Sequence, residues 1–304
     1  MVFSPRQKMT GVFFAFIAAI GFSAKAVLVK LAYIDHVDAI TLLALRMAFS
    51  LPFFLLAAWL ANRHQQHAAM TRRDWWAVGV FGFTGYYLAS FLDFLGLQYI
   101  SAGLERLILF LYPTMVVLIS ALWFRHRISK RVIAALVLSY VGIAFAYMHD
   151  MQMQQPGLLL GSALVFASAL AYAVYLIGAG HTIARIGGTR FTAYAMTVAC
   201  VAALLQFALT NALSDLAQPA RVYWLSIAMA LFSTVMPAFV LAAAIRRIGS
   251  MQTSIIGSIG PVSTIYLAYV FLGEAMSAVQ MLGSLLVLAG VLMISLRKQT
   301  PAQP

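Results

Sequence analysis

Long apolar segments alternate with short polar links along the whole chain. Each segment is about 20 residues long, enough for a helix rising 1.5 Å per residue to cross a hydrocarbon core of roughly 30 Å. Barrel strands would instead alternate apolar and polar positions over about ten residues, so helices are predicted. The ten predicted spans are residues 11–34, 39–61, 75–100, 104–124, 132–148, 157–179, 191–210, 222–245, 252–272 and 278–296.

Composition supports a membrane protein and excludes most other classes. The 304 residues are 63% hydrophobic and only 9% charged, with a mean hydropathy of +0.92. Soluble domains carry about 25% charged residues, so this chain has too few charged side chains to cover a water-facing surface. Cys200, the single cysteine, permits neither an internal disulfide nor a thiolate metal site. With no zinc, nucleophile-elbow or nucleotide-binding motif, the sequence predicts no enzyme, no metal and no cofactor.

The charges outside the spans indicate how the chain is oriented. Fifteen basic residues fall in the links on one side of the predicted bundle, and only Arg221 falls on the other. Because basic residues gather on the cytoplasmic side, both termini are predicted to be cytoplasmic. The same asymmetry explains the net charge of +12, so this charge does not indicate a nucleic-acid partner. The fifteen are Arg6, Lys8, Arg63, Arg72, Arg73, Arg125, Arg127, Lys130, Arg131, Arg185, Arg190, Arg246, Arg247, Arg297 and Lys298.

The chain carries an internal repeat with a shift of 148 residues. The shift aligns Pro113 with Pro261 and Gly142 with Gly290. It also aligns the basic link after the fourth span with the turn at Glu274, so equivalent links carry opposite charge. We therefore predict two inverted five-helix repeats, residues 1–150 and 151–304. Inverted repeats that rock about a site near the membrane midplane are typical of transporters.

Six charged residues lie inside the predicted spans, all in the outer half of the first repeat. Each costs at least about 2.5 kcal/mol near the membrane centre, so they are expected to face the bundle interior. One interpretation is a polar binding site or gate, with Asp93 or Glu105 carrying a proton. The alternative is structural, with ion pairs joining helices and Lys30 reaching the headgroups. The six are Lys25, Lys30, Arg46, Asp93, Glu105 and Arg106.

Tyrosines and prolines within spans are the remaining candidates. Tyr172 and Tyr175 place rings and hydroxyl groups where they would contact a substrate, although packing explains them as well. Pro113 and Pro261 are candidate hinges, because proline frees a backbone carbonyl and kinks a helix. A static kink is the alternative for both prolines.

Two stretches carry a resemblance to a known family. Residues 96–124, GLQYISAGLERLILFLYPTMVVLISALWF, resemble the junction of the third and fourth helices in the EamA branch of the drug/metabolite transporter superfamily. Residues 256–294 resemble its closing helix pair, with the Gly273–Glu274 turn followed by Gly283 and Gly290. The resemblance implies a carrier in the inner membrane that exports amino acids, other metabolites or toxic compounds through a central cavity, with or without coupling to protons.

The predicted function is therefore efflux of a small metabolite, such as an amino acid, by a secondary transporter with alternating access. One alternative is an exchanger or importer of organic anions or phosphorylated metabolites, since Lys25 and Arg46 suit an anionic group. Another is a membrane scaffold or sensor that transports nothing. The expected partners are a small-molecule substrate, membrane lipid and, in one version, protons, with the chain as a monomer or homodimer.

Overall fold

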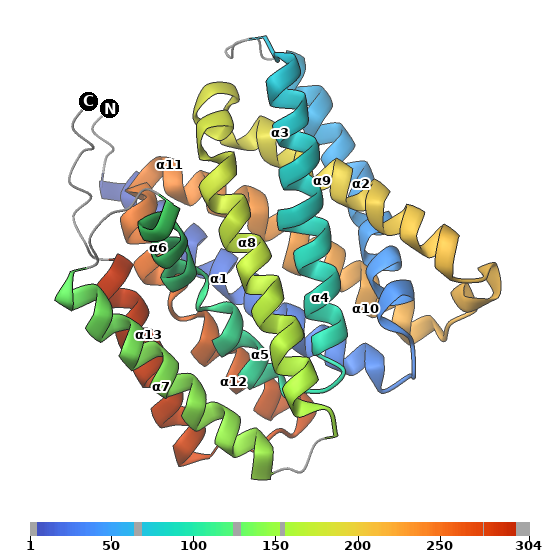
Figure 1. Ribbon diagram of the computed structural model, residues 1–304. Coiled ribbons are helices and arrows are strands. Elements are labelled where there is room, and N and C mark those ends of the chain that lie inside the picture. Colours follow the sequence, from blue (N-terminus) through green and yellow to red (C-terminus); the bar gives the residue numbers. More distant parts are fainter. Residues whose placement is uncertain (1–4, 64–68, 124–128, 153–155, 276, 296–304) are drawn as a thin grey trace.

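The described part of the chain is built from helices, and no strand occurs in it. The computed structural model describes residues 5–63, 69–123, 129–152, 156–275 and 277–295 (Figure 1). The first half comprises α1 (Pro5–Tyr33), α2 (Ala39–Arg63), α3 (Arg72–Gly82), the π-helical η1 (Phe83–Leu88), α4 (Ala89–Gly96), α5 (Ala102–Leu109), α6 (Tyr112–Trp123) and α7 (Lys130–Gln152). The second comprises α8 (Leu158–Ile186), α9 (Gly188–Thr210), the 3-10 turn η2 (Leu213–Leu216), α10 (Ala220–Ala230), the π-helical η3 (Leu231–Val235), α11 (Met236–Gly257), α12 (Gly260–Leu272) and α13 (Ala278–Ser295).

Among the described residues, nine helical segments are long and apolar enough to cross a membrane, and Ala278–Ile294 is apolar but shorter. These ten segments lie where the ten spans were predicted, with differences at several ends. The third ends at Gly96 and not at residue 100, because Ser101 accepts a hydrogen bond from Leu104 N and caps the next helix. The sixth continues seven residues beyond its predicted end, to Ile186, and in this extension Arg185 forms an ion pair with Asp74.

The repeat is visible in the backbone as well as in the sequence. In the first half, α3, η1, α6 and α7 begin at Arg72, Phe83, Tyr112 and Lys130. Their counterparts α10, η3, α12 and α13 begin 148 residues later in every case, at Ala220, Leu231, Gly260 and Ala278. Even the two π-helical segments coincide, although π turns are rare and occur mostly at functional sites. The duplication therefore extends to local distortions that hydropathy alone does not predict.

Most of the packing between helices joins one half of the chain to the other. α7 lies along α13, α2 along α9, and α1 along α11 (Figure 1). α8 packs against α4 and η1. These two segments are the first-half counterparts of the start of α11 and of η3, which α1 contacts. The 148-residue shift relates the contact of α1 with α11 to that of α8 with α4, and the pairs α7–α13 and α2–α9 each join equivalent helices. The two halves therefore form one interlocked bundle.

The contact between α7 and α13 depends on two glycines. A Cβ atom on Gly142 would lie 2.5 Å from the carbonyl oxygen of Gly283, and a Cβ on Gly283 would lie 2.5 Å from that of Gly142. Small residues at such places let membrane helices approach closely.

We expect Gly283→Ala to lower the free energy of unfolding by about 1–3 kcal/mol, the usual cost of overpacking. Thermal unfolding of the purified protein in detergent measures the loss. The matched control is Gly180→Ala in α8, where the added methyl group meets open space and the helix gains propensity. Equal stability of the two variants would contradict the packing argument.

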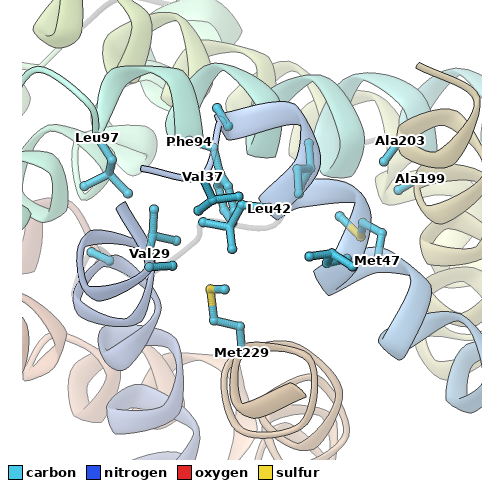
Figure 2. Packing of buried hydrophobic residues seen from close by; sticks show 14 of the residues in the cluster. Val29, Val37, Leu42, Met47, Phe94, Leu97, Ala199, Ala203 and Met229 are labelled. Atoms are coloured by element: carbon cyan, nitrogen blue, oxygen red, sulfur yellow. The ribbon is translucent and has the colours of Figure 1, made fainter. Parts of the chain in front are cut away.

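The largest apolar core lies where α1, α2, α4, α9 and α10 meet. Figure 2 shows Val29, Leu42 and Met229 pointing toward a common centre, with Phe94 beside them. Leu42, Met47 and Phe94 are fully buried. This core contains residues of both α2 and α4, and these helices carry two of the charged side chains described next.

Candidate functional site

Three of the predicted charged residues meet inside the bundle. Lys25 of α1 lies between two carboxylates, with its Nζ 2.5 Å from Asp93 Oδ2 and 3.1 Å from Glu105 Oε1. Asp93 and Glu105 are 1% and 0% exposed, and they come from α4 and α5. Lys25 donates a hydrogen bond to Asp93, and its ion pair with Glu105 is the longer of the two. Glu105 is therefore the less firmly held of the two carboxylates.

Arg46 of α2 adds a second cation at this level. It is 4% exposed, donates a hydrogen bond to Ser90 Oγ at 3.2 Å, and lies 4.9 Å from the centroid of the Phe94 ring. The charge of Asp93 acts on Arg46, but within the described ranges the guanidinium has no ion-pair partner and its Nε has no hydrogen bond. A buried guanidinium with an unsatisfied nitrogen is costly unless another group supplies an acceptor.

Arg106 of α5 is the third cation. Its Nη2 would lie 2.8 Å from a Cβ at Gly260, so it rests against the backbone where α12 begins. Ser23 of α1 donates a hydrogen bond to the Gly260 carbonyl at 2.9 Å and thus ties the same point to the first half. In the part of the chain that the structure describes, Arg106 Nε has no hydrogen-bond partner. Three cations therefore accompany two carboxylates, which leaves one positive charge if all are ionised.

Tyr172 and Tyr175 belong to a continuous group of four tyrosine rings. The Tyr172 ring is 5.4 Å from Tyr175 and 5.2 Å from Tyr112, between ring centroids. The hydroxyl groups of Tyr175 and Tyr86 are 2.9 Å apart. The charge of Arg106 acts on Tyr112 and Tyr172, so one end of the group lies near the charged cluster. Tyr112 was not predicted, because its position beside a helix break is visible only in the structure.

Pro113 and Pro261 both follow a break in a membrane helix. α5 ends at Leu109 and α6 begins at Tyr112, while α11 ends at Gly257 and α12 begins at Gly260. Proline has no N–H, so the carbonyl four residues earlier, at Leu109 or Gly257, loses its helical partner. The sequence predicts hinges at these prolines. The structure places a break beside each, at equivalent positions and next to Arg106.

Two acids from outside α5, Asp150 of α7 and Glu274 after α12, bind the first residues of α5 and the residue before it. Asp150, 1% exposed, accepts hydrogen bonds from Ser101 N and Ser101 Oγ, both at 2.9 Å. Glu274 accepts one from Ala102 N at 3.1 Å and so joins the second half to the first. Lys30 of α1 lies within electrostatic range of both acids. We call Lys30, Ser101, Asp150 and Glu274 the α5 latch.

The sequence alone indicates only one member of this latch. Ser101 stands before an apolar run, as N-cap residues do, but nothing local assigns Asp150 or Glu274 to it. Burial raises the pKa of the Glu274 carboxyl above its ordinary value. The hydrogen bond from the Ala102 N–H and the positive charge of Lys30 act in the opposite direction and lower this pKa. The carboxylates also stabilise the positive end of the helix dipole.

Taken together, the geometry favours binding of a small polar molecule. The charged cluster lies where α1, α2, α4 and α5 meet, next to the start of α12 from the other half. Arg46 and Arg106 have unused donors for an anionic group, and the tyrosine rings offer an amphipathic surface beside Arg106.

Comparison with known proteins adds independent evidence. The profile of the EamA-like transporter family matches residues 9–148 and again residues 159–296. The chain is 29% identical to the uncharacterized transporter YcbK of Bacillus subtilis over 283 residues, covering 91% of this chain and 90% of that one. It is 22% identical to the uncharacterized transporter YetK of the same organism, covering 97% and 90%.

A solved crystal structure shares the fold, with a TM-score of 0.65 and 18% identity over 94% of this chain and 97% of the other. The two profile matches fall on the two halves whose elements correspond in the structure. This chain, a multi-pass membrane protein with duplicated repeats, belongs to the EamA-like transporter family.

Proposed function

We propose that the protein is a secondary transporter that exports a small metabolite, an amino acid or a related compound, by alternating access. In this proposal residues 1–150 and 151–304 are inverted repeats of five spans, both termini are cytoplasmic, and the two halves rock about the charged cluster. The observation that carries the proposal is the buried cluster of Lys25, Arg46, Asp93, Glu105 and Arg106 beside the equivalent breaks of two membrane helices.

The cost of this cluster supports a role beyond helix packing. Charged groups inside a membrane are rare and mark substrate or ion pathways. A purely structural cluster is expected to balance its charges, yet here Arg46 and Arg106 lack ion-pair partners among the described residues. Both arginines are suited to the carboxylate of an amino acid, which would supply the missing acceptor.

The one-sided latch supports alternating access. Under the 148-residue shift, Ser101 corresponds to Gly249 and Lys30 to Gly178, so neither the cap nor the lysine is repeated at the equivalent end of the ninth span. A pathway closed by polar contacts at one end of the cluster is what one state of such a cycle requires.

The excess positive charge also favours the second candidate, an exchanger or importer of organic anions. The two candidates differ in the ligand and in the direction of net flux, and counterflow in vesicles distinguishes them.

A thermal-stability screen of the purified protein is the test, because a ligand that binds only the folded state raises its Tm. We expect a zwitterionic or acidic metabolite to raise the Tm and Arg46→Gln to remove that increase. Arg221→Gln is the matched control, since Arg221 is an exposed arginine 3.6 Å from Asp35 and remote from the cluster. If only apolar cations stabilise the protein, equally in both variants, the charged cluster is structural and the site lies elsewhere.

A further inference from the structure

One arginine fixes the end of α8 to the beginning of α3. Arg185 Nε donates a hydrogen bond to Asp74 Oδ1 at 3.0 Å, and its Nη2 forms an ion pair with Asp74 Oδ2. Arg185 also donates to the Ala69 carbonyl at 3.2 Å and to Thr71 Oγ1 at 3.5 Å, just before α3 begins. A carboxylate held by two nitrogens of one guanidinium is among the stronger ion pairs, and Asp74 is only 4% exposed. We call this contact the Arg185 clamp.

The repeat places a weaker ion pair near the counterpart of the clamp. Under the 148-residue shift, Arg221 lies one residue from the counterpart of Asp74, and Asp35 lies two residues from the counterpart of Arg185. Arg221 Nη1 is 3.6 Å from Asp35 Oδ2, and both side chains are more exposed than those of the clamp. Among the described residues, Asp35 Oδ2 has no hydrogen-bond partner. The two ends of the bundle are therefore held by different contacts, one by the clamp and the other by the α5 latch.

The contact surface between α3–η1 and α8, here called the α8 seam, runs inward from the clamp. A Cβ atom on Gly178 of α8 would overlap the Phe81 ring of α3, and one on Gly85 of η1 would overlap the Tyr175 ring of α8. Each side of the seam thus places a ring in a gap that a glycine leaves on the other. Tyr175 lies ten residues from Arg185 along α8, about 15 Å at the helical rise.

The inner end of the α8 seam reaches the charged cluster. The hydroxyl group of Tyr175 is 2.9 Å from that of Tyr86 in η1, and the Tyr175 ring is 5.4 Å from that of Tyr172. The Tyr172 ring in turn contacts Tyr112, beside the helix break next to Arg106. Because interlocked rings fill the seam, α3 and α8 must separate before a molecule can pass along it. The clamp opposes this separation.

We propose that the Arg185 clamp is the gate at the end of the transport path opposite the α5 latch. The gate is closed in this structure, and its opening lets a small metabolite reach the charged cluster along the tyrosine-lined seam. The charge asymmetry predicts this end to be cytoplasmic, the side from which an exported metabolite enters. The proposal rests on the proposed function, because a gate requires a transported molecule. Alternating access requires that the clamp and the latch are not open together, so opening one favours the closed form of the other.

Cysteine labelling measures the opening of the clamp without a ligand. Cys200→Ala removes the single cysteine, and Val78→Cys places a thiol one turn from Asp74 in the apolar cluster that α3 shares with α8, where Val78 is 1% exposed. In this background we expect Arg185→Gln to speed modification of the purified protein by a polar methanethiosulfonate about tenfold or more, because hydrogen bonds between charged groups are lost. Arg185→Lys keeps the charge but loses the fork, so its increase should be smaller. Arg221→Gln, which removes the exposed counterpart pair, is the matched control and should change nothing.

A second readout separates a gate from a local contact. If the clamp and the latch alternate, the amides of residues 101–105 should exchange with deuterium more slowly in Arg185→Gln. Conversely, Asp150→Asn, which weakens the latch, should slow the labelling of Val78→Cys. This variant leaves the clamp intact, so it tests the coupling even if Arg185→Gln folds poorly.

Two results would overturn the proposal. One is labelling of Val78→Cys that Arg185→Gln does not change. The other is faster labelling with unaltered exchange at residues 101–105 and an unaltered labelling rate in Asp150→Asn, which would make the clamp a local structural contact. Neither readout needs a substrate, so these failures are distinguishable from failure of the ligand screen, which tests the proposed function.

Discussion

Replacing Lys25 with glutamine is expected to abolish transport while the protein still inserts into the membrane. The ammonium group serves both Asp93 and Glu105, so its removal leaves two buried carboxylates without a cation at hydrogen-bond distance. Truncating one partner of a buried charge pair costs about 2 kcal/mol or more, a loss of at least about 30-fold in rate. Counterflow in proteoliposomes, with the ligand identified by thermal stabilisation, measures this loss, and Arg46→Gln should give a loss of similar size.

A second substitution separates a transport role from a structural one. In the triple variant Lys25→Gln, Asp93→Asn, Glu105→Gln, the three charges become neutral polar groups and no buried carboxylate is left without its cation, which often restores stability. If the cluster only joins helices, the triple variant should recover both Tm and transport. We expect it to recover Tm alone. Full activity of Lys25→Gln and of Arg46→Gln would remove both residues from the site.

Asp150→Asn is expected to open the α5 latch. The carboxylate accepts two hydrogen bonds from Ser101, and an amide offers one oxygen where two acceptors are needed. A lost hydrogen bond to a charged group costs about 1.5–3 kcal/mol, so the amides of residues 101–105 should exchange about 10- to 100-fold faster. Hydrogen–deuterium exchange followed by mass spectrometry reads these amides directly.

Asp215→Asn provides the control for this experiment. Asp215 accepts a hydrogen bond from Ala212 N at 3.0 Å and closes η2 in the same manner, but on an exposed turn. Its substitution should leave residues 101–105 unchanged. Unaltered exchange of these amides in Asp150→Asn would show that the latch is held by other contacts, and the one-sided closure would lose its support.

The sequence was sufficient for the helical membrane class and the duplicated repeats because lipid imposes strong constraints on every span. A charged or unsatisfied polar group in the hydrocarbon is costly, so long apolar segments and their charged links are visible without a structure. The 148-residue repeat was visible for the same reason, through the alternation of charge in equivalent links. Charges inside the spans at Lys25, Arg46 and Asp93 stood out against that background and indicated a polar site.

Hydropathy could not decide which charged groups would meet. Both Lys25 and Lys30 lie in the first span, yet Lys25 pairs with Asp93 and Glu105 while Lys30 lies near Asp150 and Glu274. The difference depends on which face of α1 each occupies and on which helices pack there. The π turns at Phe83 and Leu231 were likewise invisible, because they depend on how neighbouring helices fit together.

Thus the sequence by itself determined the membrane class, the duplicated repeats and the set of polar residues available for a site. Only the tertiary structure decided the partners: Asp150 and Glu274 joined to the start of α5, Arg106 set against Gly260, and Arg46 left without a counterion among the described residues. The physical reason is that burial in lipid acts on each segment separately, whereas the pairing of charges depends on contacts between segments far apart in the chain.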